Sequence, residues 1–219
     1  MISYVITIMD NPKSVEVAKR CIASTTDVTI NHFKAITPKD DLEKILKDNN
    51  IKNLDNFKSD TRYSRYDRCL SAFLSHLHCW KKCIENNETT LIFEHDAVMF
   101  GNLPNNLNFN KVITLAKPSY GSYNHPTMFG LNPLTQKRYF GGAHGYMIKP
   151  AGARELLEKS KTDAGPTDVF LNLDNFPWLQ EYYPWIIEVK DTFTTIQNNR
   201  GCRAKDLSHM KEPRAYEII

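Results

Sequence analysis

Short apolar runs rich in Val, Ile, Phe and Thr recur along the chain, and each is followed by a polar or charged stretch. Runs of this length and composition are typical of β-strands buried in a sheet. We predict five such strands, at 3–9, 28–36, 89–100, 111–117 and at the start of the segment 145–160.

Segments with apolar residues at helical spacing separate these strands. They predict helices at 14–24, with Ser14 as a candidate N-cap, around 40–49, and after the turn within 145–160. The clearest helix covers 69–87, whose buried face is formed by Leu70, Phe73, Leu74, Leu77 and Trp80. Strands that alternate with helices imply an α/β fold with a mostly parallel central sheet flanked by helices.

The chain has 219 residues, enough for one sizeable core, so we predict a single domain over 1–219. Two segments interrupt the regular pattern. The stretch 53–68 is polar and aromatic, and 117–140 is rich in Gly, Pro, Tyr and Asn. Long irregular segments inside a compact domain are usually functional, so we expect both to face a ligand or partner. The tail 197–219 is polar and basic.

The net charge of +3 suits an anionic ligand such as a nucleotide, whereas a dedicated nucleic-acid-binding protein would carry a stronger basic bias. No apolar run approaches the roughly 18 residues of a membrane span. The first residues look like a strand rather than a signal peptide, so we expect a cytoplasmic protein of a bacterium or an infected host cell. The five cysteines lack a CxxC pair, which favours reduced thiols over disulfides or a zinc site.

Glu94, His95 and Asp96 follow directly on an apolar run. Burying such charges costs free energy unless a partner compensates them, so we expect a partner at this position. In an open α/β sheet, ligands gather outside the carboxyl ends of the strands, and alternate residues of an extended chain share a face. Two carboxylates there, together with phosphate oxygens, are typical ligands of Mg²⁺ or Mn²⁺ at a nucleotide site. The alternative is that both acids are solvated loop residues.

Three segments carry further motifs: 69–100, the stretch FGGAHGYMIKPAGARELLE from 140, and GPTDVFLN from 165. In this order they resemble glycosyltransferase family 25, whose members transfer sugars onto lipooligosaccharide or collagen hydroxylysine. The similarity runs over roughly 65–175, with a weaker match from Tyr4 to Asp10. The residues that carry it are Ser75, His76, Trp80 and Glu94-His95-Asp96, then Gly142, His144, Gly145 and Tyr146, and finally Asp168.

The resemblance implies a GT-A-like (Rossmann-like) domain that uses Mn²⁺ or Mg²⁺. It implies hexosyl or pentosyl transfer, with inversion, from a nucleotide-diphosphate donor such as a UDP-sugar to an acceptor hydroxyl. Residues 1–115 would form the donor-binding half and 116–196 the acceptor side. The family's Glu-Asp-Asp triplet has His95 in its middle position here, which leaves the preferred metal open.

The resemblance also implies roles for individual residues. Asp168 is the expected general base and His144 a ligand-facing residue between glycines, although Asp168 also suits a helix N-cap. His76 is expected to be a core histidine, hydrogen-bonded below the site. The candidate metal ligands are Asp96, His95 and His209. The candidate donor-binding residues are Thr7, Asp10, Glu94, Arg62, Arg65 and Arg203, of which the arginines also suit a solvated surface.

The acceptor is less defined. A saccharide such as lipooligosaccharide is one candidate. The Asn- and Lys-rich composition is typical of an AT-rich genome such as that of a phage or virus, where a hydroxymethylated DNA base becomes a second candidate. Basic residues between tyrosines would then follow the phosphate backbone, and the base would be flipped out. A different interpretation is a non-catalytic, transferase-like module that binds a sugar or a partner.

Overall fold

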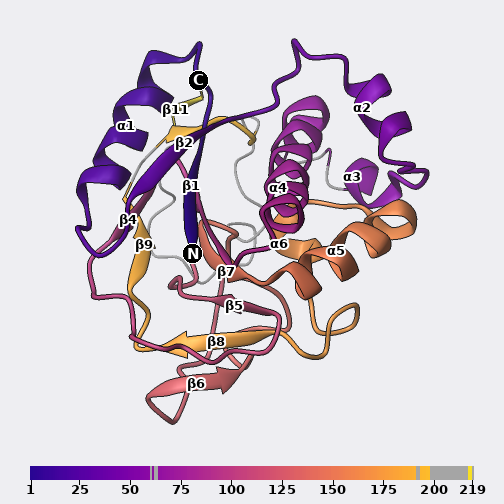
Figure 1. The fold of residues 1–219 in the computed structure, drawn as a ribbon. Helices are drawn as coiled ribbons and strands as arrows, with labels where there is room; N and C mark the ends of the chain where they lie inside the picture. Colours follow the sequence, from indigo (N-terminus) through magenta and orange to yellow (C-terminus); the bar gives the residue numbers. More distant parts are fainter. Residues whose placement is uncertain (60, 62–63, 191–192, 198–216, 219) are drawn as a thin grey trace.

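The computed structural model describes residues 1–59, 61, 64–190, 193–197 and 217–218 (Figure 1). In chain order its elements are β1 (Ile2–Thr7), α1 (Pro12–Ala23), β2 (Ile30–Lys34), α2 (Leu42–Asp48), α3 (Asp55–Ser59), α4 (Tyr66–Asn86), β3 (Thr90–Glu94), β4 (Ala97–Met99), β5 (Val112–Thr114), β6 (Gly130–Pro133), β7 (Gly145–Ile148), α5 (Pro150–Asp163), α6 (Thr167–Phe170), β8 (Gln180–Tyr183), β9 (Ile187–Val189), β10 (Phe193–Thr194) and β11 (Glu217–Ile218).

The predicted strands and helices are present, with four differences. One of them is that the segment 117–140, expected to be irregular, contains the strand β6. The expected strand 89–100 is two strands, because His95 and Asp96 form a turn between β3 and β4. Helix α1 begins at Pro12 with Asn11 as its N-cap, so the N-cap expected at Ser14 was wrong. Asn11 accepts bonds from two backbone N–H groups of the first turn, which leaves the Ser14 hydroxyl for other contacts. The segment 53–68, expected to be a loop, contains α3.

The main sheet has seven strands in the order β2-β1-β3-β7-β5-β8-β6. Strands β2, β1, β3, β5 and β8 run in one direction, and β7 and β6 run in the other. The expected α/β domain with a mostly parallel sheet is therefore confirmed in its coarse form, but the sheet is mixed. The antiparallel strand β7 lies at its centre.

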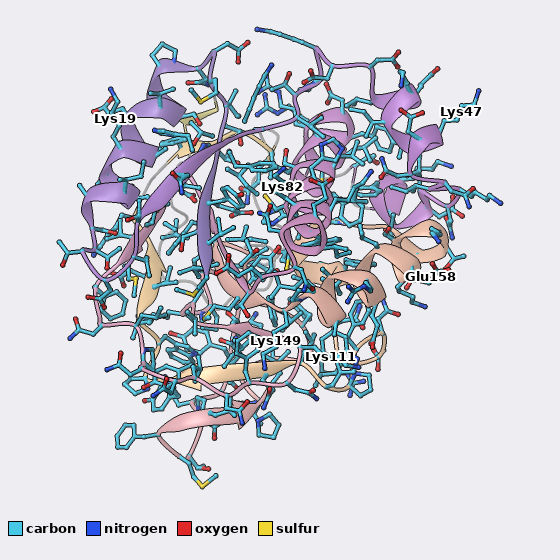
Figure 2. The ribbon with its side chains drawn as sticks, viewed as in Figure 1. Lys19, Lys47, Lys82, Lys111, Lys149 and Glu158 are labelled. Atoms are coloured by element: carbon cyan, nitrogen blue, oxygen red, sulfur yellow. The ribbon has the colours of Figure 1, made fainter. Side chains whose placement is uncertain are left out.

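Helices cover both faces of this sheet, as the alternation of side chains along β3 shows. Leu91 and Phe93 pack on the side of α1, whereas Ile92 packs into the larger core beneath α4 and α5. Charged side chains such as Lys19, Lys47 and Glu158 lie on the outer faces of the helices (Figure 2). Among the described residues, no helix combines the length and apolarity that crossing a membrane requires.

The expectation of reduced cysteines is confirmed for the described part of the chain. Cys21, Cys69, Cys79 and Cys83 are buried thiols that belong to no disulfide. Burial raises the pKa of the Cys21 thiol to about 12, so this side chain behaves as a small apolar group. Cys202 lies outside the described residues.

Candidate active site

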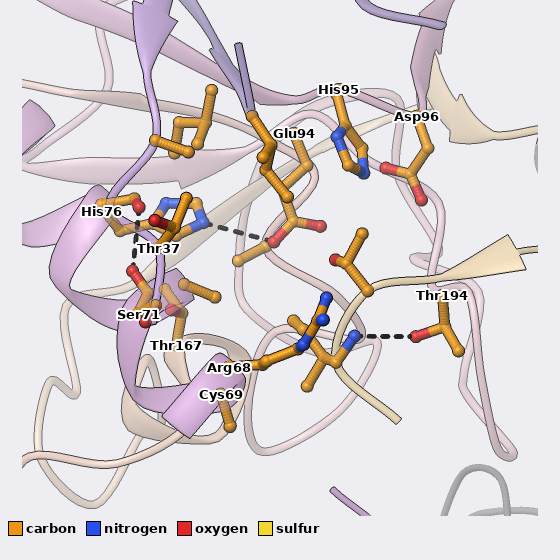
Figure 3. A pocket seen from close by; sticks show the side chains of 18 of the residues that line it. Thr37, Arg68, Cys69, Ser71, His76, Glu94, His95, Asp96, Thr167 and Thr194 are labelled. Atoms are coloured by element: carbon orange, nitrogen blue, oxygen red, sulfur yellow. Dashed lines mark hydrogen bonds and ion pairs between the residues drawn. The ribbon is translucent and has the colours of Figure 1, made fainter. Parts of the chain in front are cut away.

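A cavity of about 640 Å³ opens at the edge of the sheet where β1, β2 and β3 end (Figure 3). The segments that follow these three strands line it, together with one face of α4. Because β7 runs antiparallel to β3, the beginning of β7 lies at the same edge, and residues 142–144 also line the cavity. Residues 166–168 and 193–197 complete the wall. One cavity thus collects loops from both halves of the chain.

The three residues of the Glu94-His95-Asp96 triplet all line this cavity. Glu94 ends β3, and the other two form the turn that leads into β4. A charge at the end of this buried strand is tolerable because the side chain of Glu94 is 33% exposed and its carboxylate accepts a hydrogen bond, at 3.2 Å, from Nε2 of His76 on α4. Figure 3 shows the other oxygen of Glu94 turned towards the cavity.

His76 is itself held by a buried chain of hydrogen bonds. Its Nδ1 lies 2.9 Å from the hydroxyl of Tyr146 on β7, and this hydroxyl accepts a bond of 2.8 Å from Nε1 of Trp80. The indole N–H only donates, so the hydroxyl proton of Tyr146 goes to His76 Nδ1. His76 therefore carries its proton on Nε2 and donates it to Glu94. The expectation that His76 is a satisfied core histidine below the site is confirmed.

Glu94 is held in its ionised form by this arrangement. Burial opposes ionisation, but the hydrogen bond that His76 donates, together with the neighbouring rings of His144 and His95, outweighs it and lowers the pKa of Glu94. The carboxylate is thus available to a hydroxyl or to a cation at neutral pH.

His95 faces the cavity beside Glu94, and its other side is anchored to α1. Its Nδ1 lies 2.5 Å from the hydroxyl oxygen of Ser14, which also accepts a bond of 2.9 Å from the backbone N–H of Ile8. The ring of Phe193 packs at 5.7 Å from the His95 ring. His95 is therefore an oriented side chain and belongs to the cavity wall.

Asp96 follows His95 in the chain and lines the cavity, and its backbone carbonyl accepts a hydrogen bond from the N–H of Lys190 at 3.3 Å. No three His, Cys, Asp or Glu side chains of the described residues are grouped as a metal site. His209, a candidate ligand, lies outside the described residues. Mg²⁺ sites commonly combine one or two carboxylates with oxygens of the substrate and of water, and Asp96 is a carboxylate of this kind.

Asp168 lines the cavity from α6, which packs against α4 through Phe170. One carboxylate oxygen accepts a bond from the hydroxyl of Tyr120, and the other accepts a bond of 2.9 Å from the N–H of Val169. The N-cap of α6 is Pro166, so Asp168 does not serve as the N-cap. A carboxylate with this support still has lone pairs for the proton of a bound hydroxyl.

His144 lines the cavity between Glu94 and the loop at Gly142, and only 1% of it is exposed. Burial lowers its pKa, although the charge of Glu94 and the backbone of Lys117 act in the opposite direction. The ring is therefore neutral at neutral pH. Gly142 has φ of +122°, and a Cβ there would lie 2.5 Å from His144 Nδ1. The Gly-x-His motif thus lets the histidine ring pack against bare backbone.

The predicted donor-binding residues are only partly brought together. Asp10 lines the cavity and is paired with Lys39. Thr7 does not line it, because its hydroxyl bonds within the sheet to His32 and to the backbone of Val5. Arg65 also stays outside the lining, and its guanidinium donates to the carbonyl of Thr195 at 2.7 Å. The two other predicted donor residues, Arg62 and Arg203, lie outside the described part of the chain.

Two residues that support the proposed site residues had no such role assigned from the sequence: Tyr120, which lines the cavity, and Ser14, which lies behind it and contacts His95. Arg68 follows Arg62 and Arg65 closely in the chain, and its charge likewise suits an anion. Figure 3 shows its side chain reaching into the cavity from α4. The contact of Ser14 with His95 spans 81 positions and that of Tyr120 with Asp168 spans 48. No local pattern could have indicated either contact.

A family model described as glycosyltransferase family 25 (LPS biosynthesis protein) matches residues 2–124, more than half of the chain. The matched part contains α4 and the Glu94–Asp96 triplet. It ends before Gly142, His144 and Asp168, so the later motifs rest on their position in the cavity. No curated protein sequence matches the chain at a significant level.

Proposed function

The chain belongs to glycosyltransferase family 25, and we propose that it transfers a sugar from a nucleotide-diphosphate donor, such as a UDP-sugar, to an acceptor hydroxyl. The observation that carries this proposal is the shared cavity. It joins the triplet at the end of β3 with His144 and Asp168, which come from the unmatched half of the chain. The acids at the carboxyl edge of a mixed sheet support a GT-A-like (Rossmann-like) arrangement.

We place the nucleoside of the donor at the apolar end of the cavity. Ile8, Ile36 and Pro38, from the loops after β1 and β2, offer a surface for a flat base. The diphosphate would then lie near Arg68, at the beginning of α4. No side chain of the described residues caps this 21-residue helix, so its first N–H groups and its dipole favour an anion there.

Asp96 is the residue that would hold Mn²⁺ or Mg²⁺, with phosphate oxygens of the donor as further ligands. This donor set fits a hard cation, since a carboxylate lines the cavity where the diphosphate is expected. The cation, when bound, supplies positive charge to the diphosphate as it leaves the sugar. Glu94 would accept a hydrogen bond from a donor hydroxyl, because its second oxygen faces the cavity.

Asp168 is the proposed general base. It would take the proton of the acceptor hydroxyl while the acceptor oxygen bonds to the anomeric carbon and the bond from that carbon to the phosphate oxygen breaks. Attack from the side opposite the diphosphate inverts the anomeric centre. The bonds from Tyr120 and Val169 hold the carboxylate in place during this step. Neutral His144 would contact the sugar without adding charge.

The lining favours an uncharged saccharide as the acceptor over a hydroxymethylated base in DNA. Arg68 and Lys39 are the lysine and arginine side chains among the lining residues, and Lys39 is already paired with Asp10. A DNA backbone would meet more negative than positive charge at such a surface. The carboxylates among the lining residues are Asp10, Asp67, Glu94, Asp96 and Asp168.

Donor hydrolysis tests the proposal. A panel of UDP- and GDP-sugars is incubated with the chain in Mn²⁺, Mg²⁺ or chelator, and the released nucleotide is measured. We expect one donor to be turned over only with metal, and Asp96→Ala to abolish turnover. Asp174→Ala is the matched control, because Asp174 is 74% exposed and is not among the lining residues.

The active donor is then offered with oligosaccharides or with hydroxymethylated DNA, and product formation assigns the acceptor class. A chain that binds UDP but turns over no donor in any metal would refute the transfer proposal. That result would favour a non-catalytic module that binds a sugar nucleotide.

A further inference from the structure

The contact between Ser14 and His95 fixes which nitrogen of the histidine ring carries a proton. Ser14 is fully buried, and its hydroxyl oxygen already accepts the backbone N–H of Ile8. Among the described residues, the acceptor within reach of its own proton is Nδ1 of His95, at 2.5 Å. A buried hydroxyl proton is bonded wherever an acceptor is available. Nδ1 therefore accepts, and the neutral ring carries its proton on Nε2.

A ring in this tautomer cannot act as a metal ligand through its cavity-facing nitrogen. A histidine that binds a metal offers a lone pair to the ion and donates its other N–H to a neighbouring acceptor. His95 shows the opposite arrangement, because its anchored nitrogen receives a proton. It presents an N–H donor to the cavity, and such a donor suits an anion.

The surroundings of His95 indicate which anion. Figure 3 shows its ring turned into the cavity, while the side chain of Arg68 enters from α4. The first turn of α4, which lines the same cavity, adds backbone donors. Phe193 packs against the ring and keeps it from rotating away. An extended anion with several oxygens, such as a diphosphate, can reach donors from both sides.

We propose that His95 binds the diphosphate of the donor through Nε2–H, and that Ser14 is the positioning residue that holds the ring in this tautomer. The middle position of the triplet would then contribute a hydrogen-bond donor in place of a carboxylate, and metal binding would rest on Asp96. The inference builds on the proposed function, and it replaces the expectation that His95 is a metal ligand.

Titration calorimetry with inorganic pyrophosphate and with UDP, each in chelator, tests the proposed contact. Hydrogen bonds to charged groups contribute about 1.5–3 kcal/mol, so we expect His95→Ala to weaken both ligands by about 10- to 100-fold. Its affinity for Mn²⁺ alone should equal that of the native chain. His78→Ala is the matched control, because His78 lies on α4 and is not among the lining residues.

The tautomer itself gives a second measurement. Long-range proton–nitrogen correlation spectra should show His95 protonated on Nε2 in the native chain. Ser14→Ala should lose this preference and part of the pyrophosphate affinity, and Ser14→Thr, which keeps the hydroxyl, should restore both. A merely structural role of Ser14 would leave the tautomer unchanged.

The outcomes separate the two proposals. Unchanged pyrophosphate affinity in His95→Ala, a loss of Mn²⁺ affinity in that variant, or a proton on Nδ1 in the native chain each overturns the inference. A native chain that binds neither pyrophosphate nor UDP overturns it as well. If pyrophosphate binding depends on His95 but no sugar donor is ever turned over, the proposed function fails and the anion site stands.

Discussion

Removal of one buried hydroxyl, in Tyr146→Phe, is expected to weaken both the fold and the site. Tyr146 is fully buried, and its hydroxyl links Trp80 to His76 at 2.8 and 2.9 Å. Phe fills nearly the same volume, so the change removes the two hydrogen bonds and little packing. It leaves the indole N–H of Trp80 and Nδ1 of His76 without their partners.

The size of the effect follows from these two groups. A buried polar group that loses its partner destabilises a protein by about 1–3 kcal/mol. Two such groups, partly relieved by relaxation, predict that Tyr146→Phe lowers the free energy of unfolding by about 2–4 kcal/mol. That loss is above the roughly 1 kcal/mol at which measured point mutations are centred.

Urea unfolding of a double-mutant cycle measures the interaction. The partner substitution is Trp80→Phe, which removes the indole N–H together with some packing. Because the double variant has no unsatisfied indole N–H, it should be less destabilised than the sum of the single variants, by about 1–2 kcal/mol. Additivity within about 0.5 kcal/mol would refute the hydrogen-bonded chain.

The same substitution should change how Glu94 titrates. Without the Tyr146 hydroxyl, the proton of His76 is no longer fixed on Nε2, and the hydrogen bond that lowers the pKa of Glu94 weakens. The pKa of Glu94 should therefore rise, and the acid limb of the pH profile of donor turnover should move to higher pH. An unchanged profile would show that Glu94 does not depend on this chain.

Three further predictions concern other parts of the site. Asp168→Asn should lower kcat at least about 100-fold at unchanged donor affinity, measured by kinetics and calorimetry, and a variant with native turnover would exclude Asp168 as the base. Gly142→Ala should lower the free energy of unfolding by more than about 1 kcal/mol and by more than the control Gly130→Ala, whose φ is also positive but whose Cβ would meet nothing within 4 Å. The lowered pKa of His144 adds stability that is present above its unfolded pKa near 6.5 and is lost as pH falls through its folded value. Urea unfolding at several pH values should therefore show a smaller loss of stability on acidification in His144→Gln than in the native chain.

Much of the fold could be predicted because its signals are local. The apolar face of α4 recurs at helical spacing, and the expected residues Leu70, Phe73 and Trp80 are buried. The position of Glu94 at the end of a buried strand was likewise readable from the run that precedes it. The split of this strand into β3 and β4 was not, since apolar residues continue on both sides of the turn.

The contacts that complete the site join residues far apart in the chain, and the local sequence around each residue does not predict them. His76 bonds to a tyrosine 70 positions away, and Ser14 to a histidine 81 positions away. The direction of β7 within the sheet also cannot be predicted from the sequence of its four residues. That direction decides whether the histidine before the strand meets Glu94 or lies at the far edge of the sheet, and it depends on how the preceding loop crosses the sheet.

Which of two neighbouring arginines lines the cavity depends on a small structural difference, the position at which α4 starts. Arg65 and Arg68 stand three positions apart, and both carry a charge that suits a diphosphate. Arg65 precedes α4 with an extended backbone, with φ of −75° and ψ of 116°, and its side chain turns to the Thr195 carbonyl. Arg68 lies inside the first turn and lines the cavity. Because no Ser, Thr, Asp or Asn occupies the N-cap of α4, the start of this helix is not marked by a capping residue. A start shifted by one turn would exchange the positions of the two arginines. In the structure the backbone N–H of Arg65 donates to the Ile196 carbonyl at 2.9 Å, so a long-range contact accompanies the start that is observed.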